Sequence, residues 1–299
     1  MRIAVLGAAA GGGFPQWNSN GDGCRRARAG DPAARPRTQA GLAVSSDGER
    51  WTLLNASPDL RQQIAASACL HPREGLRSSP IESVVLTGGD VDVVAGLLTL
   101  RERQPLRLYA TAKIHAVLDA NSIFEVLARD VVGREAMELG RSATVGQGLE
   151  VELFAVPGKV PLYLEENDAP AIAADETTTG AAVSDGRSTI FFIPGCAAMT
   201  PDLAERLRGA DLVLFDGTLW RDDEMVVQGL GPKTGRRMGH MSISGPDGAL
   251  AAFEGLGVKR KVFIHLNNSN PVLLDDTSER REVERAGWEV AYDGLEIVL

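Results

Sequence analysis

The sequence predicts an α/β protein in which two sheets pack together and helices cover their outer faces. Strand-like segments alternate with helix-compatible segments in the first half of the chain, which is typical of parallel strand–helix units. In the middle of the chain, strand-like segments follow one another closely, as antiparallel pairs do. The chain has 299 residues, of which 44% are hydrophobic, so its apolar volume is sufficient for a large core.

The chain begins with a predicted buried strand from Arg2 to Leu6 and continues into a glycine-rich loop. Glycines at positions 7, 11, 12 and 13 allow the backbone to take positive φ or to approach another group closely. A dinucleotide-binding fingerprint would need a helix directly after these glycines. Because Pro15 and the polar residues 16–23 stop such a helix, we expect a loop that lies against a site rather than a phosphate cradle.

The following elements are predicted in chain order from apolar patterns and from helix and strand breakers. The arginine-rich stretch 25–38 contains two prolines and is expected to be an exposed connection. Ser57-Pro58-Asp59 is a typical helix start, and this helix would end near Cys69. Further strands are expected at 40–46, 51–55, 82–86, 106–110, 149–155, 180–185, 188–193, 211–215, 261–264, 289–292 and 295–298, and further helices at 92–103, at 112–130, from Thr200 and at 278–285.

Two aspartates stand at the tip of a predicted strand-to-helix turn. Asp90 and Asp92 follow the apolar run 83–86 and precede a second apolar run. Carboxylates at the carboxyl end of a strand are where α/β folds place metal or substrate chemistry. The structural alternative is an ordinary acidic turn in which Asp92 caps the next helix. This segment alone leaves both interpretations open.

Other polar residues also directly follow predicted strands. Asp216 and His265 each come after an apolar strand, and His240 stands after a glycine at a predicted turn or helix start. Two of the four histidines in such positions, together with the strand-end aspartates, predict a metal site. His71 and His115 lie in ordinary helix or loop contexts and are interpreted as structural residues.

Charge and composition exclude several classes of partner. The formal net charge of −9 argues against binding to nucleic acid or to an anionic membrane surface. No apolar run approaches the about 20 residues that span a bilayer, and the N-terminus does not resemble a signal peptide, so we expect a cytoplasmic protein. Three widely spaced cysteines fit a reducing compartment. The sequence leaves open whether the chain forms a homodimer.

Distinct motifs occur in order from one end of the chain to the other. They are Gly-Gly-Gly-Phe-Pro-Gln-Trp-Asn at 11–18, Asn-Ala-Ser-Pro-Asp at 55–59, His-Pro-Arg at 71–73, Asp-Val-Asp at 90–92, Gly-Leu-Leu-Thr-Leu-Arg-Glu at 96–102, Val-Pro-Gly-Lys-Val-Pro-Leu at 156–162, Ile-Pro-Gly-Cys at 193–196, Phe-Asp-Gly-Thr at 215–218, Lys-Thr-Gly at 233–235, Met-Gly-His-Met at 238–241 and His-Leu-Asn-Asn-Ser-Asn-Pro at 265–271. In these motifs the whole chain resembles the pyrroloquinoline quinone (PQQ) biosynthesis protein B family, a branch of the metallo-β-lactamase fold.

The resemblance implies a single metallo-β-lactamase-like domain over residues 1–299, an αββα sandwich with a metal site at the strand ends. It also implies a role in PQQ assembly, as a non-haem iron hydroxylase that uses Fe(II) to oxygenate a tyrosine-derived ring. The partner would be a small-molecule or dipeptide quinone precursor of the Glu-Tyr type. Carried over position by position, the metal-site candidates are Asp90, Asp92, Asp216, His240 and His265.

The chain departs from the family pattern at two places. The superfamily's first metal motif is H-x-H-x-D-H, and the PQQ branch keeps its second half, ending Asp-His. Here Val93 follows Asp92, and since valine has no lone pair, one coordination bond is lost. Where the family usually has a C-x-C-x-x-C zinc clip, residues 19–24 keep only Cys24, so a structural zinc is not expected there.

Two histidines and one carboxylate are sufficient for a non-haem iron site. His240, His265 and Asp92, with Asp216 in reserve, are therefore expected to hold a single Fe(II), with lower affinity than a site with the extra histidine. Lys159 stands where hydrolytic relatives carry another metal-binding histidine, and it is expected either to pair with a substrate carboxylate or to be solvated. The candidate catalytic residues are Asp92, His240 and Lys159.

Three functions remain to be distinguished at this point. The first is the iron hydroxylase of PQQ assembly. The second is a divergent member whose metal site is degraded and which binds or transports PQQ or its precursor. The third is a metal-dependent phosphodiesterase or other hydrolase of the superfamily, which usually needs two metals. The absence of histidine at positions 88 and 90 argues against this third function.

Overall fold

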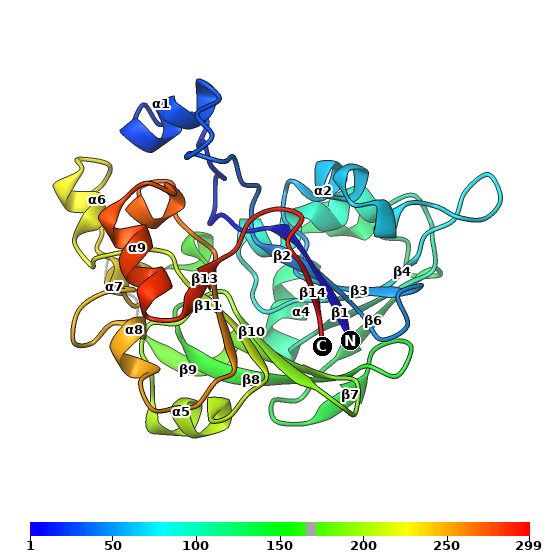
Figure 1. Cartoon of the computed structure of the whole chain (residues 1–299). Coiled ribbons are helices and arrows are strands. Elements are labelled where there is room, and N and C mark those ends of the chain that lie inside the picture. The colour runs from blue at the N-terminus through cyan, green and yellow to red at the C-terminus, as the bar shows by residue number, and fades with distance from the viewer. Residues whose placement is uncertain (166–171) are drawn as a thin grey trace.

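Two seven-stranded sheets lie face to face in the computed structural model, which describes residues 1–165 and 172–299 (Figure 1). The strands of the first sheet are, in spatial order, β14 (Glu296–Val298), β1 (Arg2–Gly7), β2 (Gly41–Ser45), β3 (Trp51–Leu54), β4 (Ile81–Val85), β5 (Leu106–Ala110) and β6 (Val132–Ala136). Those of the second are β13 (Trp288–Val290), β12 (Arg260–Ile264), β11 (Leu212–Asp216), β10 (Thr189–Ile193), β9 (Ala173–Ser184), β8 (Glu150–Gly158) and β7 (Ser142–Thr144).

Each sheet combines an antiparallel part with a parallel part. In the first sheet, β14 to β3 pair antiparallel and β3 to β6 pair parallel. In the second sheet, β7 to β10 pair antiparallel and β10 to β13 pair parallel. Parallel neighbours need a crossover connection, and such crossovers carry helices to the outer faces. The predicted α/β class, with two mixed sheets and helices outside, is confirmed.

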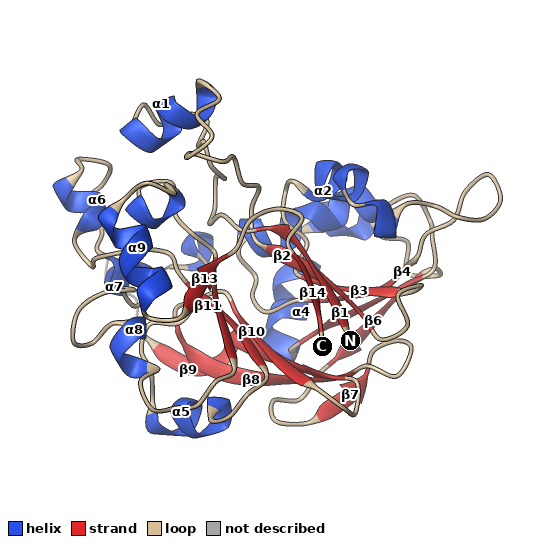
Figure 2. Ribbon diagram, viewed as in Figure 1, coloured by secondary structure: helices blue, strands red, loops and turns tan. Residues whose placement is uncertain are grey.

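The helices are short and lie at the outer faces and at the ends of the sheets (Figure 2). The α-helices are α1 (Asp22–Arg28), α2 (Leu60–Ala66), α3 (Val91–Val94), α4 (Ala112–Asp119), α5 (Pro201–Leu207), α6 (Glu224–Val227), α7 (Gly235–Met238), α8 (Ala249–Ala252) and α9 (Ser278–Arg285). The 3₁₀ segments are η1 (Ala68–Leu70), η2 (Ala95–Leu100), η3 (Ser122–Val126), η4 (Leu162–Leu164) and η5 (Pro271–Leu273).

Alternation along β1 shows how the sheets build two apolar layers. Ile3 and Val5 belong to the core cluster that includes the inner residues of both sheets. Ala4 and Leu6 belong to the second cluster, which the first sheet forms with side chains of α2 and α4. Successive side chains of a strand point to opposite faces, so a strand covered on both sides must be apolar throughout. Each fully buried Leu or Ile side chain contributes about 1.5–3 kcal/mol to folding.

The helix predicted at 92–103 is shorter than expected and changes type. It consists of α3 followed by the 3₁₀ segment η2. The backbone here docks against the loop after β3, because the Gly96 N–H donates to the Ala56 carbonyl at 2.8 Å and the Ala56 N–H donates to the Val93 carbonyl at 2.8 Å. A Cβ at Gly96 would lie 2.0 Å from the Ser57 carbonyl oxygen, so only glycine permits this approach. This docking fixes the turn that carries the aspartates.

Some elements differ from the sequence prediction. The stretch 25–38, predicted as an exposed connection, begins within α1. Its Arg37 is buried, and the side chain donates to the Ala291 carbonyl at 2.9 Å. The helix predicted to 130 ends at Asp119 and is followed by η3. The short strands β6 and β7 and the four-residue helices α6, α7 and α8 were not predicted, because segments of three to five residues show no measurable periodicity.

Candidate metal centre

The site begins where two parallel strands of the second sheet end side by side. β11 ends at Asp216, which lies opposite Ile264 on β12, so His265 leaves the neighbouring strand one residue later. His265 has a φ of 60°, a left-handed conformation that is uncommon for histidine. The Thr218 hydroxyl oxygen lies 3.0 Å from the His265 carbonyl oxygen, beside this turn. Strained backbone of this kind is concentrated at functional sites.

His240 reaches the same place from the end of α7. Gly239 caps this helix with a φ of 89°, a conformation that glycine adopts without strain. The His240 N–H donates to the Gly235 carbonyl at 2.9 Å, which continues the turn of the helix. A Cβ at Gly239 would lie 3.2 Å from Cγ of Lys159, so the glycine also lets this lysine pack beside the histidine.

Asp216, His240 and His265 form a cluster that could hold a metal ion. Each offers one ligand atom, and these atoms lie within 4.8 Å of one another. In the described part of the chain, it is the one group of three or more His, Cys, Asp or Glu side chains close enough to share a metal ion. The two imidazole rings stack with their centroids 5.2 Å apart. Two imidazole nitrogens and a carboxylate oxygen form the donor set of many catalytic zinc sites. The residues therefore fit a divalent metal such as Zn²⁺.

Asp216 is fully buried and both of its carboxylate oxygens are held by the chain. Oδ2 accepts the Cys196 N–H at 2.9 Å and lies 2.7 Å from Nδ1 of His240. Oδ1 accepts both the backbone N–H of Thr218, at 3.0 Å, and its hydroxyl, at 2.6 Å. A carboxylate held in this way fixes the orientation of the imidazole that it contacts, as partners of metal-bound histidines do.

Thr218 is a site residue that was not predicted as one. Its hydroxyl oxygen lies 3.1 Å from Nδ1 of His240 and 2.9 Å from Nδ1 of His265, besides its contact with Asp216. One hydroxyl therefore touches all three members of the cluster. The sequence signal was present in the Phe-Asp-Gly-Thr motif at 215–218, which places Thr218 two residues after the strand-end aspartate.

Asp92 joins the cluster through the opposite nitrogen of His265. Its Oδ2 lies 2.9 Å from Nε2 of the histidine. Burial alone would raise the pKa of Asp92, but the hydrogen bond and the charge of His265 outweigh it and hold this pKa below its usual range. Burial likewise would lower the pKa of His265, and Asp92 raises it above its usual value. The two groups form a hydrogen-bonded pair in the metal-free protein, which is an ion pair when His265 is protonated.

A cavity of about 430 Å³ opens onto these side chains. Asp90, Asp92, Val93, His240 and His265 all line it. Burial and the neighbouring charge of Asp92 raise the pKa of Asp90. Asp90 occupies the N-terminal cap position of α3 without a side-chain cap hydrogen bond, and Asp92 lies in the first turn. The alternative of an ordinary capped acidic turn is therefore wrong, and the isopropyl group of Val93 faces the cavity beside the aspartates.

Lys159 lines the same cavity, but it is not solvated. Its side chain is 13% exposed, and Nζ lies 2.9 Å from Oε1 of Glu165. Glu165 also accepts from Arg237 at 2.9 Å, and Lys233 lies 3.9 Å away. Sequence reasoning did not identify Glu165, because no motif marked it.

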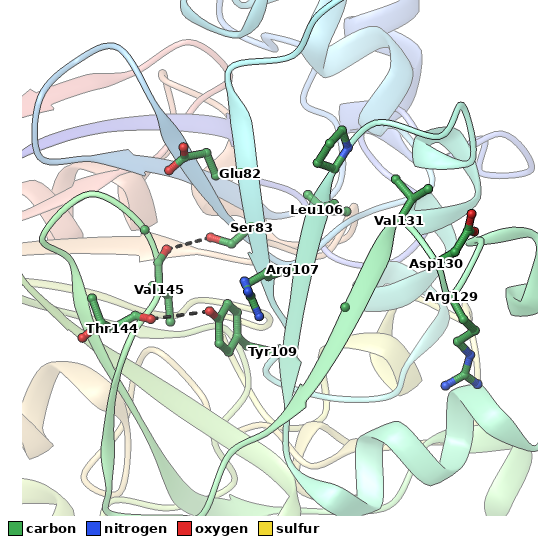
Figure 3. A pocket seen from close by; sticks show the side chains of 13 residues that line it. Glu82, Ser83, Leu106, Arg107, Tyr109, Arg129, Asp130, Val131, Thr144 and Val145 are labelled. Carbon is green, nitrogen blue, oxygen red and sulfur yellow. Dashed lines mark hydrogen bonds between the residues drawn. The ribbon is translucent and has the colours of Figure 1, made fainter.

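A second cavity, of about 580 Å³, lies beside β4, β5 and the loop at 144–146 (Figure 3). Ser83 donates to the Val145 carbonyl at 2.8 Å and Tyr109 to the Thr144 carbonyl at 3.4 Å, so polar groups of its wall join the two sheets. Its arginines pair with neighbouring acids: Arg107 with Glu135 at 2.5 Å and Arg129 with Asp119 at 2.7 Å. No histidine or cysteine lines it, so this cavity lacks the chemistry of the first one.

The remaining candidate residues lie outside the cluster. His71 is exposed, with Nε2 3.1 Å from the Ala65 carbonyl, and the buried His115 has Nε2 2.9 Å from the Glu135 carbonyl. The thiol of Cys24 is buried and lies 3.7 Å from Oδ1 of Asn268.

Comparison with known proteins identifies the family. Residues 50–266 match the model of the beta-lactamase superfamily domain. The chain is 59% identical, over 302 aligned residues, to coenzyme PQQ synthesis protein B of Gluconacetobacter diazotrophicus, with 99% of this chain and 98% of the relative covered. The chain belongs to the coenzyme PQQ synthesis protein B family. The member from Methylorubrum extorquens is 54% identical over 299 residues, with both chains fully covered.

A solved structure of this family corrects the expected metal. The crystal structure of Zn²⁺-bound PqqB from Methylobacterium extorquens covers 100% of both chains with 54% identity and a TM-score of 0.98. The expectation of Fe(II) is therefore wrong, and zinc is the metal that the comparison supports. The physical reason for the error is that a set of two histidines and a carboxylate suits both metals, so the donor types do not select iron.

More distant structures share only the fold. A diphosphatase from the PhnP family is 21% identical with a TM-score of 0.70, covering 99% of this chain and 97% of that chain. At that identity the similarity supports the metallo-β-lactamase fold and not the hydrolytic activity. None of the helices in the described parts of the chain is long and apolar enough to cross a membrane.

Proposed function

We propose that this protein acts in PQQ assembly by binding a carboxylated precursor of the quinone beside a bound Zn²⁺. The observation that carries the proposal is the cluster of Asp216, His240 and His265, two members of which, His240 and His265, line one cavity. It is supported by 59% identity to a coenzyme PQQ synthesis protein B along nearly the whole chain. The same cavity contains lysines on its wall, which suit an anionic ligand.

His240 and His265, with Asp216 and Asp92 as the available carboxylates, are the residues that would hold the metal. Bound Zn²⁺ supplies Lewis-acid chemistry, the polarisation of a substrate oxygen. The chain supplies orientation, because Asp216 fixes the ring of His240. Asp90, whose pKa is raised by burial and by Asp92, is the carboxyl group suited to hold a proton near a bound ligand.

Hydroxylation of a tyrosine-derived ring is the finer activity implied by the family resemblance, and it stays a prediction. Zn²⁺ has no redox chemistry, so it cannot accept the electrons that an oxidation removes from the ring, and a separate oxidant would be needed. Val93 favours a second candidate function, in which the protein binds PQQ or its precursor without changing it. Its isopropyl group faces the cavity where the family pattern has a metal-binding histidine.

Metal binding by the cluster is tested with the variants His265→Ala and His71→Ala. At a zinc concentration 100 times the Kd, mass action stabilises the folded state by about 2.7 kcal/mol, which raises the melting temperature by several degrees. We expect this shift in the wild type and in His71→Ala, whose exposed histidine lies outside the cluster. We expect no shift in His265→Ala.

The biological role is tested by complementation. A strain of Methylorubrum extorquens that lacks its own coenzyme PQQ synthesis protein B would receive the gene for this chain. Restored PQQ production with the wild-type chain and His71→Ala, but not with His265→Ala, is the expected result. Equal restoration by His265→Ala would show that the metal cluster has no part in the role. No restoration by the wild-type chain would contradict the role itself.

A further inference from the structure

One carboxylate meets three cationic side chains beside the metal cluster. Glu165 lies 2.9 Å from Lys159 and 2.9 Å from Arg237, with Lys233 at 3.9 Å. Its side chain is 7% exposed. The hydrogen bond from Arg237, followed by that from Lys159, lowers the pKa of Glu165 to about 2, so the carboxylate is charged at neutral pH.

The cations and the carboxylate are held by different kinds of structure. Lys159 directly follows β8, while Lys233 and Arg237 lie just before and within α7. Glu165 follows the three-residue segment η4, in which Leu162, Tyr163 and Leu164 are 61%, 49% and 46% exposed. A segment that buries so little apolar surface is displaced at low cost. Within this segment, the Tyr163 hydroxyl donates to the Gly89 carbonyl.

The cationic side chains are close to the metal cluster. Lys159 and Lys233 line the cavity that His240 and His265 also line. Cγ of Lys159 would lie 3.2 Å from a Cβ at Gly239, the residue before His240, and the positive charge of Lys159 acts on Asp90. A ligand in the cavity could therefore reach the metal side chains and the lysines together.

We propose that Lys159, Lys233 and Arg237 form a binding site for a ligand carboxylate, and that Glu165 occupies this site as an internal competitor in the free protein. The inference rests on the proposed function and names the group through which a carboxylated quinone or precursor is anchored. Lysine and arginine together suit a carboxylate, since Arg offers a fork of donors and Lys a point charge. Ligand binding then exchanges one carboxylate for another, which keeps the cations paired and avoids a desolvated unpaired charge.

The test is calorimetric titration of the zinc-loaded protein with PQQ, a planar tricarboxylate, and with its trimethyl ester. Glu165→Gln removes the competing charge, so we expect it to bind PQQ about tenfold more tightly than the wild type. The ester has no free carboxylate, and its affinity is expected to be unchanged. In the double variant Glu165→Gln with Lys159→Met, the gain for PQQ should be lost. The matched control is Glu152→Gln, which breaks a 2.7 Å Glu–Arg ion pair with Arg206 that does not line the cavity.

The outcomes separate this inference from the proposed function. If PQQ binds the wild type and Glu165→Gln with equal affinity, or more weakly in the variant, Glu165 is not a competitor and the carboxylate site is overturned while ligand binding stands. An equal gain for the ester would also overturn the site, because the effect would not depend on carboxylates. If neither protein binds PQQ although both bind zinc, the proposed function and the inference fail together.

Discussion

Nε2 of His265 lies 2.9 Å from Oδ2 of Asp92, although 173 residues separate them in the chain. Asp92 lies in α3, which follows β4 of the first sheet, and His265 directly follows β12 of the second sheet. Their contact therefore joins the two sheets at the cavity. The other nitrogen of His265 faces the Thr218 hydroxyl at 2.9 Å. In the metal-free protein both ring nitrogens are therefore occupied by partners, and a metal must replace one of them.

The variant Asp92→Asn is expected to lower the pKa of His265. Burial, the largest influence on the pKa of this histidine, is then opposed only by the smaller effects of the Asp216 and Asp90 charges. In the wild type, His265 contributes stability that is complete below its ordinary pKa of about 6.5 and is lost as pH rises through its raised folded value. Asp92 contributes stability that is complete above about pH 4 and is lost as pH falls through its lowered folded value. NMR titration of the histidine rings in metal-free protein measures the change.

His71 provides the internal reference for this titration, because its exposed ring lies outside the cluster. At any one pH, the replacement of Asp92 should leave the His71 signal unchanged. Exposed Asp22→Asn serves as the matched control for the loss of an acidic side chain. A His265 signal that titrates at the same pH with and without Asp92 would contradict the ion pair.

A second prediction concerns the pH dependence of stability and the partly buried Asp293. Its Oδ2 accepts the backbone N–H and the hydroxyl of Thr38, both at 2.7 Å, yet burial raises the pKa of Asp293 to about 6. At pH values between the unfolded pKa near 4 and this folded pKa, the folded state binds more protons at Asp293 than the unfolded state does. Over this range the free energy of unfolding therefore falls as pH rises. Asp293→Asn should remove this fall.

Urea unfolding of the wild type and of Asp293→Asn at pH 4.5 and pH 7 checks the prediction. From pH 4.5 to pH 7, the free energy of unfolding of the wild type should fall by about 2 kcal/mol relative to that of the variant. Exposed Asp22→Asn should show no such movement. A difference that stays constant with pH would mean that Asp293 is ionised throughout.

The parts of the fold that the sequence predicts well are the continuous apolar strands. The segment 261–264 was expected as a strand and is observed within β12, because its run Val262–Ile264 is apolar and fully buried, as the interior of a covered strand is. Short elements were not predictable in the same way. α3 ends after four residues because Gly96 packs against the Ala56 and Ser57 backbone, and nothing local to 92–103 reveals that contact.

The candidate site shows a similar division. Asp92, His240 and His265 were predicted from their places after strands or glycines, and the structure brings them to one cavity. Glu165 was not predicted, since its three cations come from residues 6, 68 and 72 positions away in the sequence, and only the folded chain brings them together. The identity of the metal also lay beyond the sequence, because the donor types suit zinc and iron alike.

Thr218→Val removes the hydroxyl that touches all three members of the metal cluster while keeping the shape of the side chain. Outer partners of metal ligands are typically worth 10- to 100-fold in affinity, so zinc affinity should fall by about this factor. Thr52→Val is the control, because its buried hydroxyl bonds to Ser83 and Val145 away from the cluster. Competition with a fluorescent zinc chelator measures both. Equal losses in the two variants would indicate general destabilisation, and Thr218→Ser should recover most of the affinity.

Val93→His restores the imidazole that the family pattern places after Asp92. Val93 lines the cavity, so a larger side chain at this position can extend into it. An additional nitrogen donor beside Asp92 and His265 should raise zinc affinity by about tenfold or more, the scale at which side chains around a metal act. The same chelator competition measures the gain.

Val93→Thr is the matched control, because it keeps the branched shape and adds a hydroxyl in place of an imidazole. Its zinc affinity should stay close to that of the wild type. A gain in Val93→His that disappears in the double variant with His265→Ala would show that the new histidine acts with the existing cluster. Equal zinc affinity in Val93→His and Val93→Thr would mean that the turn at 90–93 holds position 93 out of reach of the metal. The cluster of Asp216, His240 and His265 would then bind zinc without help from this turn.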